Sequence, residues 1–229
     1  MTTADTPESP TGAAGDLLDA VEARVLGVLV EKAFVTPDTY PLSVNALVAG
    51  CNQLTGREPV MNLTEAQVNA ALDRLISLKL AARRDQAGAR VAKYEHLLRL
   101  RYSLPPPEQA VLATLMLRGP QTPGEIRQRC ERMHAFADIG AVDAVLEHLA
   151  EKYPALSAAL PRAPGTKETR HAHLLCGEAV LEQIIAEHTA VGGTTGRGRN
   201  AELEDEVRRL RAELDALRAE FDDFRAQFQ

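Results

Sequence analysis

The sequence predicts a mainly α-helical protein with small β wings, arranged as two tandem winged-helix domains followed by a C-terminal coiled-coil helix. Three observations indicate this fold class: a pattern that occurs twice, the order helix, helix, helix, hairpin within each copy, and a heptad at the C-terminal end. The matching segments are 22–26 with 108–112, 68–75 with 142–149, and 94–98 with 171–175. Because the copies are longer than ordinary solenoid repeats, we interpret them as a duplicated small domain.

The chain of 229 residues is long enough for two domains of roughly 80 residues each, with additional tails. Its predicted parts are a disordered N-terminus (1–16), a first winged-helix domain (17–101), a proline linker (102–107), a second winged-helix domain with a trailing helix (108–190), a glycine-rich linker (191–200) and a coiled coil (201–229). Pro105, Pro106 and Pro107 are expected to keep the proline linker extended, because consecutive prolines prevent a helix from continuing.

The first domain is expected to begin with a helix over about residues 17–32. A single buried stripe at helical spacing supports it, made of Leu18, Val21, Val25 and Leu29. Pro37 lies in the segment that ends this helix, and Ser43 is placed to cap a second helix that follows Pro41. The glycine and proline in residues 55–59 predict a loop before the third helix.

The third helix has the clearest start signal in the chain. Thr64 and Gln67 form a capping box, in which each side chain can accept a hydrogen bond from the other residue's backbone N–H. Two short extended segments, 81–85 and 90–95, then flank a glycine-containing turn. They predict a hairpin, which is the wing of the first domain.

The second domain repeats this plan. Thr122 opens another capping box with Glu125, and Pro123 stands at the first helical position. A third helix is expected over about residues 141–152, followed by a long wing with prolines at its tip. A trailing helix is expected over about residues 178–188.

The C-terminal segment carries a heptad pattern of apolar residues. Its a positions are Val207, Leu214, Phe221 and Phe228, and its d positions are Leu203, Leu210, Leu217 and Phe224. In a parallel homodimer, opposite charges face each other as Glu206 with Arg211, Glu213 with Arg218, and Glu220 with Arg225. We therefore expect the protein to pair with itself in parallel; the alternative is one amphipathic helix that folds back onto the body.

The charge distribution gives only weak support for nucleic-acid binding. Residues 17–101 carry 11 basic and 9 acidic side chains, and residues 102–178 carry 8 basic and 9 acidic side chains. A strong non-specific DNA-binding protein usually has a clearly basic face. Only the first domain has a positive balance, and the excess is small.

Composition also bears on compartment and membrane contact. No apolar run approaches the roughly 18 residues that span a bilayer, and no secretory leader precedes the first domain, so no membrane partner is expected. The three cysteines, Cys51, Cys130 and Cys176, are widely separated, which favours a reduced, cytoplasmic protein. Cys51, next to small residues, is expected to be a core residue.

No catalytic residue, metal site or cofactor is predicted. The sequence has no glycine-rich phosphate loop, nucleophile elbow or metal-hydrolase helix, so we expect a protein that is not an enzyme. His171, His173 and Cys176 are close in sequence, and Cys130 lies four residues before His134. Structural zinc sites need four ligands in paired motifs, so these residues are interpreted as ordinary hydrogen-bonded and core side chains.

The residues also resemble a known family. The stretches that carry the resemblance are EARVLGVLVEKAFVTPDTYPLSVNALVAGCNQ, REPVMNLTEAQVNAALDRL and RVAKYEHLL in the first half, and LRGPQTPGEIRQRC and LPRAPGTKETRHAHLLCG in the second. The chain is similar to the YceH family of bacterial proteins over nearly its whole length. The resemblance implies two tandem winged-helix domains and supplies no activity.

Two hypotheses for function remain open. The first is a dimeric DNA-binding transcriptional regulator that acts through the first domain, and the second is a non-catalytic adaptor that binds protein partners. For the first, Asn69, Arg74 and Ser77 lie on the helix face that would reach duplex DNA, and the wing residues that would meet phosphates are Arg83, Arg84, Arg90 and Lys93. Asp73 on the same helix opposes phosphate binding, and the acidic third helix of the second domain favours the adaptor.

Overall fold

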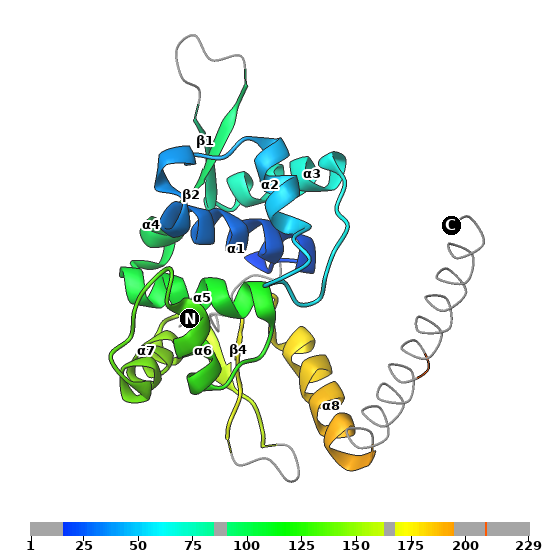
Figure 1. Cartoon of the computed structure of the whole chain (residues 1–229), viewed down its shortest axis with the longest axis vertical. Helices are drawn as coiled ribbons and strands as arrows, with labels where there is room; N and C mark the ends of the chain where they lie inside the picture. Colours follow the sequence, from blue (N-terminus) through cyan, green and yellow to red (C-terminus); the bar gives the residue numbers. More distant parts are fainter. Residues whose placement is uncertain (1–15, 85–90, 163–167, 195–208, 210–229) are drawn as a thin grey trace, which may run out of the picture. The chain divides into compact units, whose positions relative to one another are not determined.

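The computed structural model describes residues 16–84, 91–162 and 168–194, together with Arg209. These residues form a mainly helical protein with small antiparallel hairpins (Figure 1). The chain divides into two compact units, of which the first contains residues 1–162 and 167–183. The helices and hairpins of both sequence repeats up to Gln183 of the trailing helix belong to this first unit. The predicted coiled coil (201–229), apart from Arg209, and the predicted disordered N-terminus (1–16), apart from Asp16, lie outside the described part.

Each repeat contributes helices and one hairpin, in the same order. The first repeat forms α1 (Ala20–Val35), η2 (Pro37–Thr39), α2 (Val44–Cys51), α3 (Glu65–Ser77), β1 (Ala81–Arg84), β2 (Lys93–His96) and α4 (Leu98–Tyr102). The second repeat forms α5 (Pro106–Arg118), α6 (Pro123–Cys130), α7 (Ile139–Glu151), β3 (Ser157–Ala159), β4 (His171–His173) and α8 (Glu178–Thr194).

The backbone pairing is the same in the two repeats. β1 pairs antiparallel with β2, and β3 pairs antiparallel with β4. In each repeat, a residue between the first and second helices also pairs with the last strand: Leu42 with Tyr94, and Gln121 with His171. The duplication that the sequence indicates therefore extends to the hydrogen-bond register.

The helix starts follow the predicted caps. The Ser43 side chain accepts from Ala46 N, and the capping boxes of Thr64 and Thr122 are both formed. These caps are confirmed. Two caps were not predicted: Asp19 and Glu22 form a capping box, so α1 begins at Ala20, and the Asp138 side chain accepts from Ala141 N at the start of α7.

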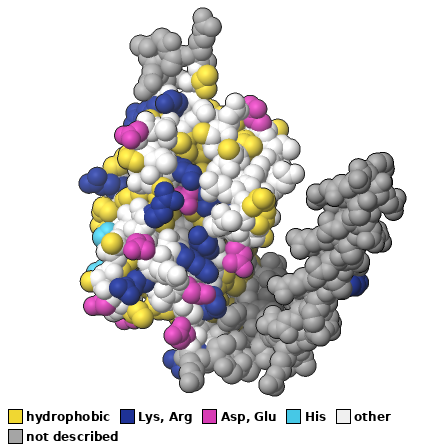
Figure 2. All heavy atoms as spheres, viewed as in Figure 1, with side chains coloured by type: hydrophobic (Ala, Val, Ile, Leu, Met, Phe, Trp, Pro, Cys, Tyr) yellow, Lys and Arg dark blue, Asp and Glu magenta, His cyan; other side chains and the backbone are white. Residues whose placement is uncertain are grey.

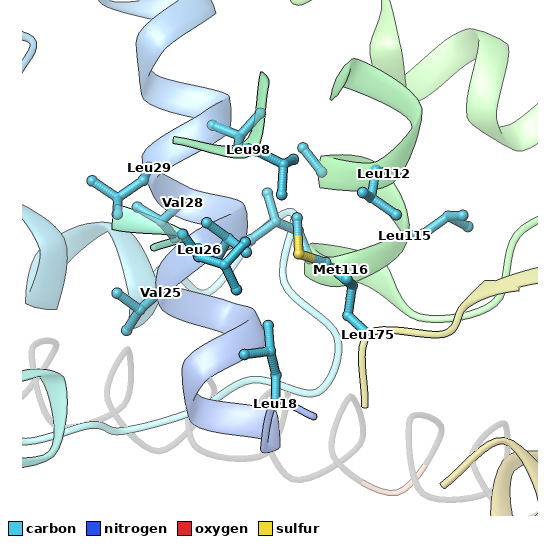
Figure 3. Packing of buried hydrophobic residues seen from close by; sticks show 14 of the residues in the cluster. Leu18, Val25, Leu26, Val28, Leu29, Leu98, Leu112, Leu115, Met116 and Leu175 are labelled. Carbon is cyan, nitrogen blue, oxygen red and sulfur yellow. The ribbon is translucent and has the colours of Figure 1, made fainter. Parts of the chain in front are cut away.

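The two repeats share one hydrophobic core, with α1 and α5 at its centre. Leu26 of α1 and Met116 of α5 lie between the two helices in Figure 3, and Leu29, Leu112 and Leu115 belong to the same buried cluster. Residues 22–30 of α1 and 108–117 of α5 are buried without interruption. The prediction of a single buried stripe on the first helix is therefore wrong. The second repeat covers the face of α1 that an isolated domain would expose to water.

A glycine allows the two central helices to approach closely. A Cβ atom at Gly27 would lie 3.0 Å from Leu117 Cδ2 and 3.1 Å from Met116 Cβ. These distances are shorter than ordinary carbon–carbon contact, so any larger side chain at this position would push α1 and α5 apart.

Half of the segment predicted as a proline linker is helical. Pro106 and Pro107 lie in the first turn of α5, and Tyr102 ends α4, so only residues 103–105 separate the two helices. Proline is tolerated in the first turn because the backbone N–H groups there have no partner within the helix. Similarly, α8 continues to Thr194, into the predicted glycine-rich linker.

The start of the first repeat is tied to the end of the second. The backbone N–H of Leu18 donates to the carbonyl oxygen of Leu175 over 2.9 Å, and both side chains are buried in the shared core. Cys176 lies nearby, with its Sγ 3.8 Å from the carbonyl oxygen of Asp19. The repeats are thus joined by backbone pairing as well as by apolar packing.

Candidate functional site

The outer face of α3 and the first hairpin form an exposed surface on the first repeat. Ser77 is exposed, Asn69 is half-buried, and Asp73 between them is exposed. The hairpin begins four residues after Ser77, and its residues Arg83 and Arg84 are exposed. The predicted residues of helix and hairpin are therefore neighbours along the chain and open to solvent.

Arg74 is directed toward the first helix. Its Nε lies 3.9 Å from Oε1 of Glu22, whose side chain is only 11% exposed. The second repeat has a matching arrangement, in which Glu108 of α5 lies 3.8 Å from His148 and 3.1 Å from Lys152. Because a basic side chain near the buried carboxylate recurs in both repeats, we interpret Arg74 as a residue that compensates Glu22.

The hairpin side chains are organised by strand pairing. Arg84 is opposite Lys93, and Arg83 is opposite Tyr94. Arg84 makes a hydrogen-bonded ion pair with Glu95, which raises the pKa of the guanidinium. Part of the positive charge on the hairpin is therefore neutralised. Arg90 lies outside the described residues.

The second repeat presents a different surface at the equivalent place. Asp143, Glu147 and Glu151 of α7 are all exposed. Ile139 at the start of α7 is 49% exposed. In Figure 1 the first hairpin and the second hairpin point away from the body in opposite directions. One straight duplex therefore cannot contact both hairpins in the same way.

The cysteines and the histidines near them lie in ordinary packing environments. Cys51 and Cys130 are buried, and burial raises the pKa of each thiol to about 11. The sulfur of Cys130 is 3.0 Å from the Thr114 hydroxyl. Within the described ranges, no group of three or more His, Cys, Asp or Glu side chains is placed to hold a metal ion.

Two histidines occupy equivalent positions at the ends of the hairpins. His96 ends β2 and His173 ends β4, and burial lowers the pKa of each imidazole to about 4. The Nδ1 atoms of both are buried without a hydrogen-bond partner among the described residues. Both imidazoles are therefore neutral structural groups at neutral pH.

A buried arginine network lies in the first repeat, and sequence patterns did not reveal it. Arg24 is 1% exposed and donates to the carbonyl oxygens of Cys51 and Pro59 over 3.2 and 2.7 Å. Arg57 donates to the Gly50 carbonyl oxygen over 2.9 Å and makes a bidentate pair with Glu31. The Arg57 guanidinium holds the pKa of the Glu31 carboxyl below its usual value, although burial opposes this effect. This network fixes the loop between α2 and α3.

The fold and the surface define a mainly helical protein with two small hairpins and a duplicated plan. Residues 18–166 match the family model described as "Protein of unknown function, DUF480". The chain is 69% identical to a UPF0502 protein of Azoarcus sp. (strain BH72) over 92% of this chain and 93% of the relative. It is 71% identical to a UPF0502 protein of Aromatoleum aromaticum over 85% of this chain and 86% of the relative.

A further UPF0502 protein, from Janthinobacterium sp. (strain Marseille), is 53% identical over 87% of this chain and 86% of the relative. The chain belongs to this family, which includes YceH, so the resemblance noted in the sequence is confirmed. In the part of the chain that the structure describes, no helix has the length and apolar character required to cross a membrane.

Proposed function

We propose that the two repeats are tandem winged-helix domains and that the protein is a regulator that binds duplex DNA through the first repeat. The order of the elements supports the domain assignment. In each repeat a first helix is followed by a residue that pairs with the last strand, then by two more helices and a hairpin, which is the order of a winged helix. One observation carries the DNA proposal: the exposed face of α3 leads directly into a hairpin with two exposed arginines, Arg83 and Arg84. The second repeat leaves this surface uncovered.

The contacts divide into two kinds. Asn69 and Ser77 are the α3 side chains suited to base edges, because an amide can bond two sites of adenine and a hydroxyl can bond any base. Arg83, Arg84 and Lys93 of the hairpin would contact phosphates. Three phosphate contacts predict a slope of roughly −3 for the logarithm of affinity against the logarithm of salt concentration. Asp73 disfavours further phosphate contacts.

The test is fluorescence anisotropy of a labelled random duplex with the purified full chain, at about 50 mM and about 200 mM salt. The double variant Arg83→Gln/Arg84→Gln should weaken binding at least tenfold at low salt and reduce the salt slope. The control Arg99→Gln/Arg162→Gln removes the same charge from exposed sites on α4 and beside the second hairpin. It should bind nearly as well as wild type. Absence of wild-type binding at about 50 mM salt would overturn the DNA proposal.

A specific observation favours a second function for the other repeat. The exposed face of α7 carries Asp143, Glu147 and Glu151, which repel phosphates, next to the half-exposed side chain of Ile139. Such a mixture of acidic and apolar groups suits a protein partner with a basic surface. Under this alternative the protein is an adaptor that contacts proteins through α7.

We also propose that residues 201–229 join two chains as a parallel coiled coil. The support is the sequence itself: apolar residues at every a and d position from Leu203 to Phe228, and opposite charges at the flanking positions. Pairing would present two copies of the first repeat, which increases the affinity for DNA that carries two sites.

A further inference from the structure

A polar cavity lies between the two repeats, away from the candidate DNA surface. Its volume is about 410 Å³, and it is lined by the end of α1, the loop that follows α2, the end of α5 and the segment after α6. Four cationic side chains line it, Lys32, Arg57, Arg118 and Arg132, whereas Glu31 is its one carboxylate. Figure 2 shows that Lys and Arg side chains are spread over both repeats on one face of the molecule.

The carboxylate does not neutralise all of this charge. Glu31 is shared by Arg57, with Nη2 at 2.6 Å from Oε2, and by Lys32, with Nζ at 3.1 Å from the same oxygen. Neither Arg118 nor Arg132 has an ion pair with a carboxylate of the described residues. The cavity therefore retains an excess of positive charge.

Arg118 is half-buried, so its charge is only partly solvated by water. Burial lowers the pKa of its guanidinium, and the nearby cations Arg129 and Arg57 lower it further. A half-buried cation among like charges gains more from an anion than an exposed one does, because its own hydration is already reduced. Glu31 and Glu58 act on Arg118 in the opposite direction, but neither forms an ion pair with it, so Arg118 gains from an anion in the cavity.

The loop around the cavity is fixed before any ligand enters. Gly56 has φ +75°, and a Cβ at this position would lie 3.0 Å from Nη2 of Arg118. The positive φ favours glycine at this position of the loop. The backbone N–H of Glu58 donates to the carbonyl oxygen of Leu117 over 2.8 Å, which holds the loop against the end of α5.

We propose that this cavity binds a small phosphate-bearing molecule, with Arg118 and Arg132 as the residues that contact its phosphate groups. Guanidinium groups match phosphate oxygens through paired hydrogen bonds, which suits them to this role. The cavity volume is in the range of small-molecule sites and is large enough for a mononucleotide. Because elements of both repeats line the cavity, a bound ligand would stabilise their contact. The proposal does not depend on DNA binding.

Isothermal titration calorimetry of the full chain with pyrophosphate, at low ionic strength and neutral pH, tests this proposal. Wild type should bind with a measurable Kd, and Arg118→Gln and Arg132→Gln should each weaken binding about tenfold or more. The matched control is Arg99→Gln, an exposed arginine on α4 that lies outside the cavity. It should bind as wild type does. Arg132 is exposed, so its variant tests the site even where Arg118→Gln fails to fold.

Three outcomes would overturn the proposal. One is the absence of pyrophosphate binding to folded wild type, and another is equal weakening by Arg99→Gln, which would indicate a general charge effect. The third combines two results: Arg132→Gln loses duplex DNA binding, and wild type does not bind pyrophosphate. That result would assign the cavity to the DNA backbone instead of a small ligand.

Discussion

Arg57 and Glu31 form a bidentate ion pair, with Nη2 at 2.6 Å from Oε2 and Nη1 at 3.1 Å from Oε1. The Arg57 side chain is only 1% exposed, and its Nε is bonded to the carbonyl oxygen at Gly50. A charge in this position depends on its one carboxylate partner, because water cannot replace it. The pair therefore holds the loop before α3 to the first helix.

Glu31→Gln should destabilise the protein by about 3 kcal/mol, because it leaves the buried Arg57 guanidinium without its counter-charge. Urea unfolding followed by circular dichroism measures the free energy of unfolding. The control is Glu95→Gln, whose partner Arg84 is exposed, and it should change the midpoint very little. Equal midpoints for the two variants would show that the pair does not stabilise the fold.

Gly27→Leu should destabilise the protein by about 1–3 kcal/mol, because the new side chain would overlap Leu117 and Met116 of α5. In a helix interior, leucine is more favourable than glycine by roughly 1 kcal/mol. The cost of the steric clash must exceed this gain for the variant to be less stable. Thermal unfolding gives the comparison. An exposed helix site, Gly140→Leu at the start of α7, is the control and should not lower Tm. A Gly27→Leu variant as stable as wild type would contradict the close approach of the two repeats.

Acidification should reduce stability through His96 and His173. Their folded-state pKa is about 4, whereas an unfolded histidine has its ordinary value of 6.5, so protons bind the unfolded chain first. The stabilisation is complete above pH 6.5 and is lost as the pH falls toward 4. At pH 5 each histidine should cost about 2 kcal/mol.

The free energy of unfolding at pH 7.5 and pH 5, for wild type and for His96→Gln/His173→Gln, measures this effect. The double variant should lose much less stability between the two pH values, since glutamine does not titrate. The carboxylates contribute equally to both proteins and cancel in the comparison. If the two proteins lose the same amount, the histidines do not cause the pH dependence.

Removal of residues 201–229 should convert a dimer into a monomer, because the heptad from Leu203 to Phe228 is the proposed contact between chains. Multi-angle light scattering of the full chain and of the shortened chain gives the two masses. A charge-reversal control, Glu213→Arg in the full chain, places arginine opposite Arg218 and should weaken the dimer only partly. Identical masses for the full and shortened chains would refute the coiled coil.

The sequence predicts local structure well where a residue type at a given position has a single structural role. The caps at Ser43, Thr64 and Thr122 are present because a hydroxyl before a helix has few other partners. The hairpins and the buried Cys51 follow from the same kind of reasoning. These signals are local, so they require no knowledge of how the repeats meet.

The wrong predictions concern the contact between the repeats. Three consecutive prolines suggested a spacer, but two of them begin α5, and this helix packs on α1. The uninterrupted apolar run after Arg24 indicates burial on all sides of the helix, whereas the spacing of Leu18, Val21, Val25 and Leu29 indicates only one buried stripe. Arg57 was missed for another reason: its burial depends on carbonyl groups and a carboxylate distant in sequence, which no spacing pattern shows. The residues proposed for DNA contact stay a prediction.

The bond from Leu18 to Leu175 has a consequence for synthesis of the protein on the ribosome. Residue 18 leaves the ribosome long before residue 175 is made, and the same delay separates α1 from the helix that covers it. The first repeat must therefore wait with an apolar helix face open to water or to chaperones. Its core closes only when the second repeat has emerged, so the nascent chain gains its full stability late.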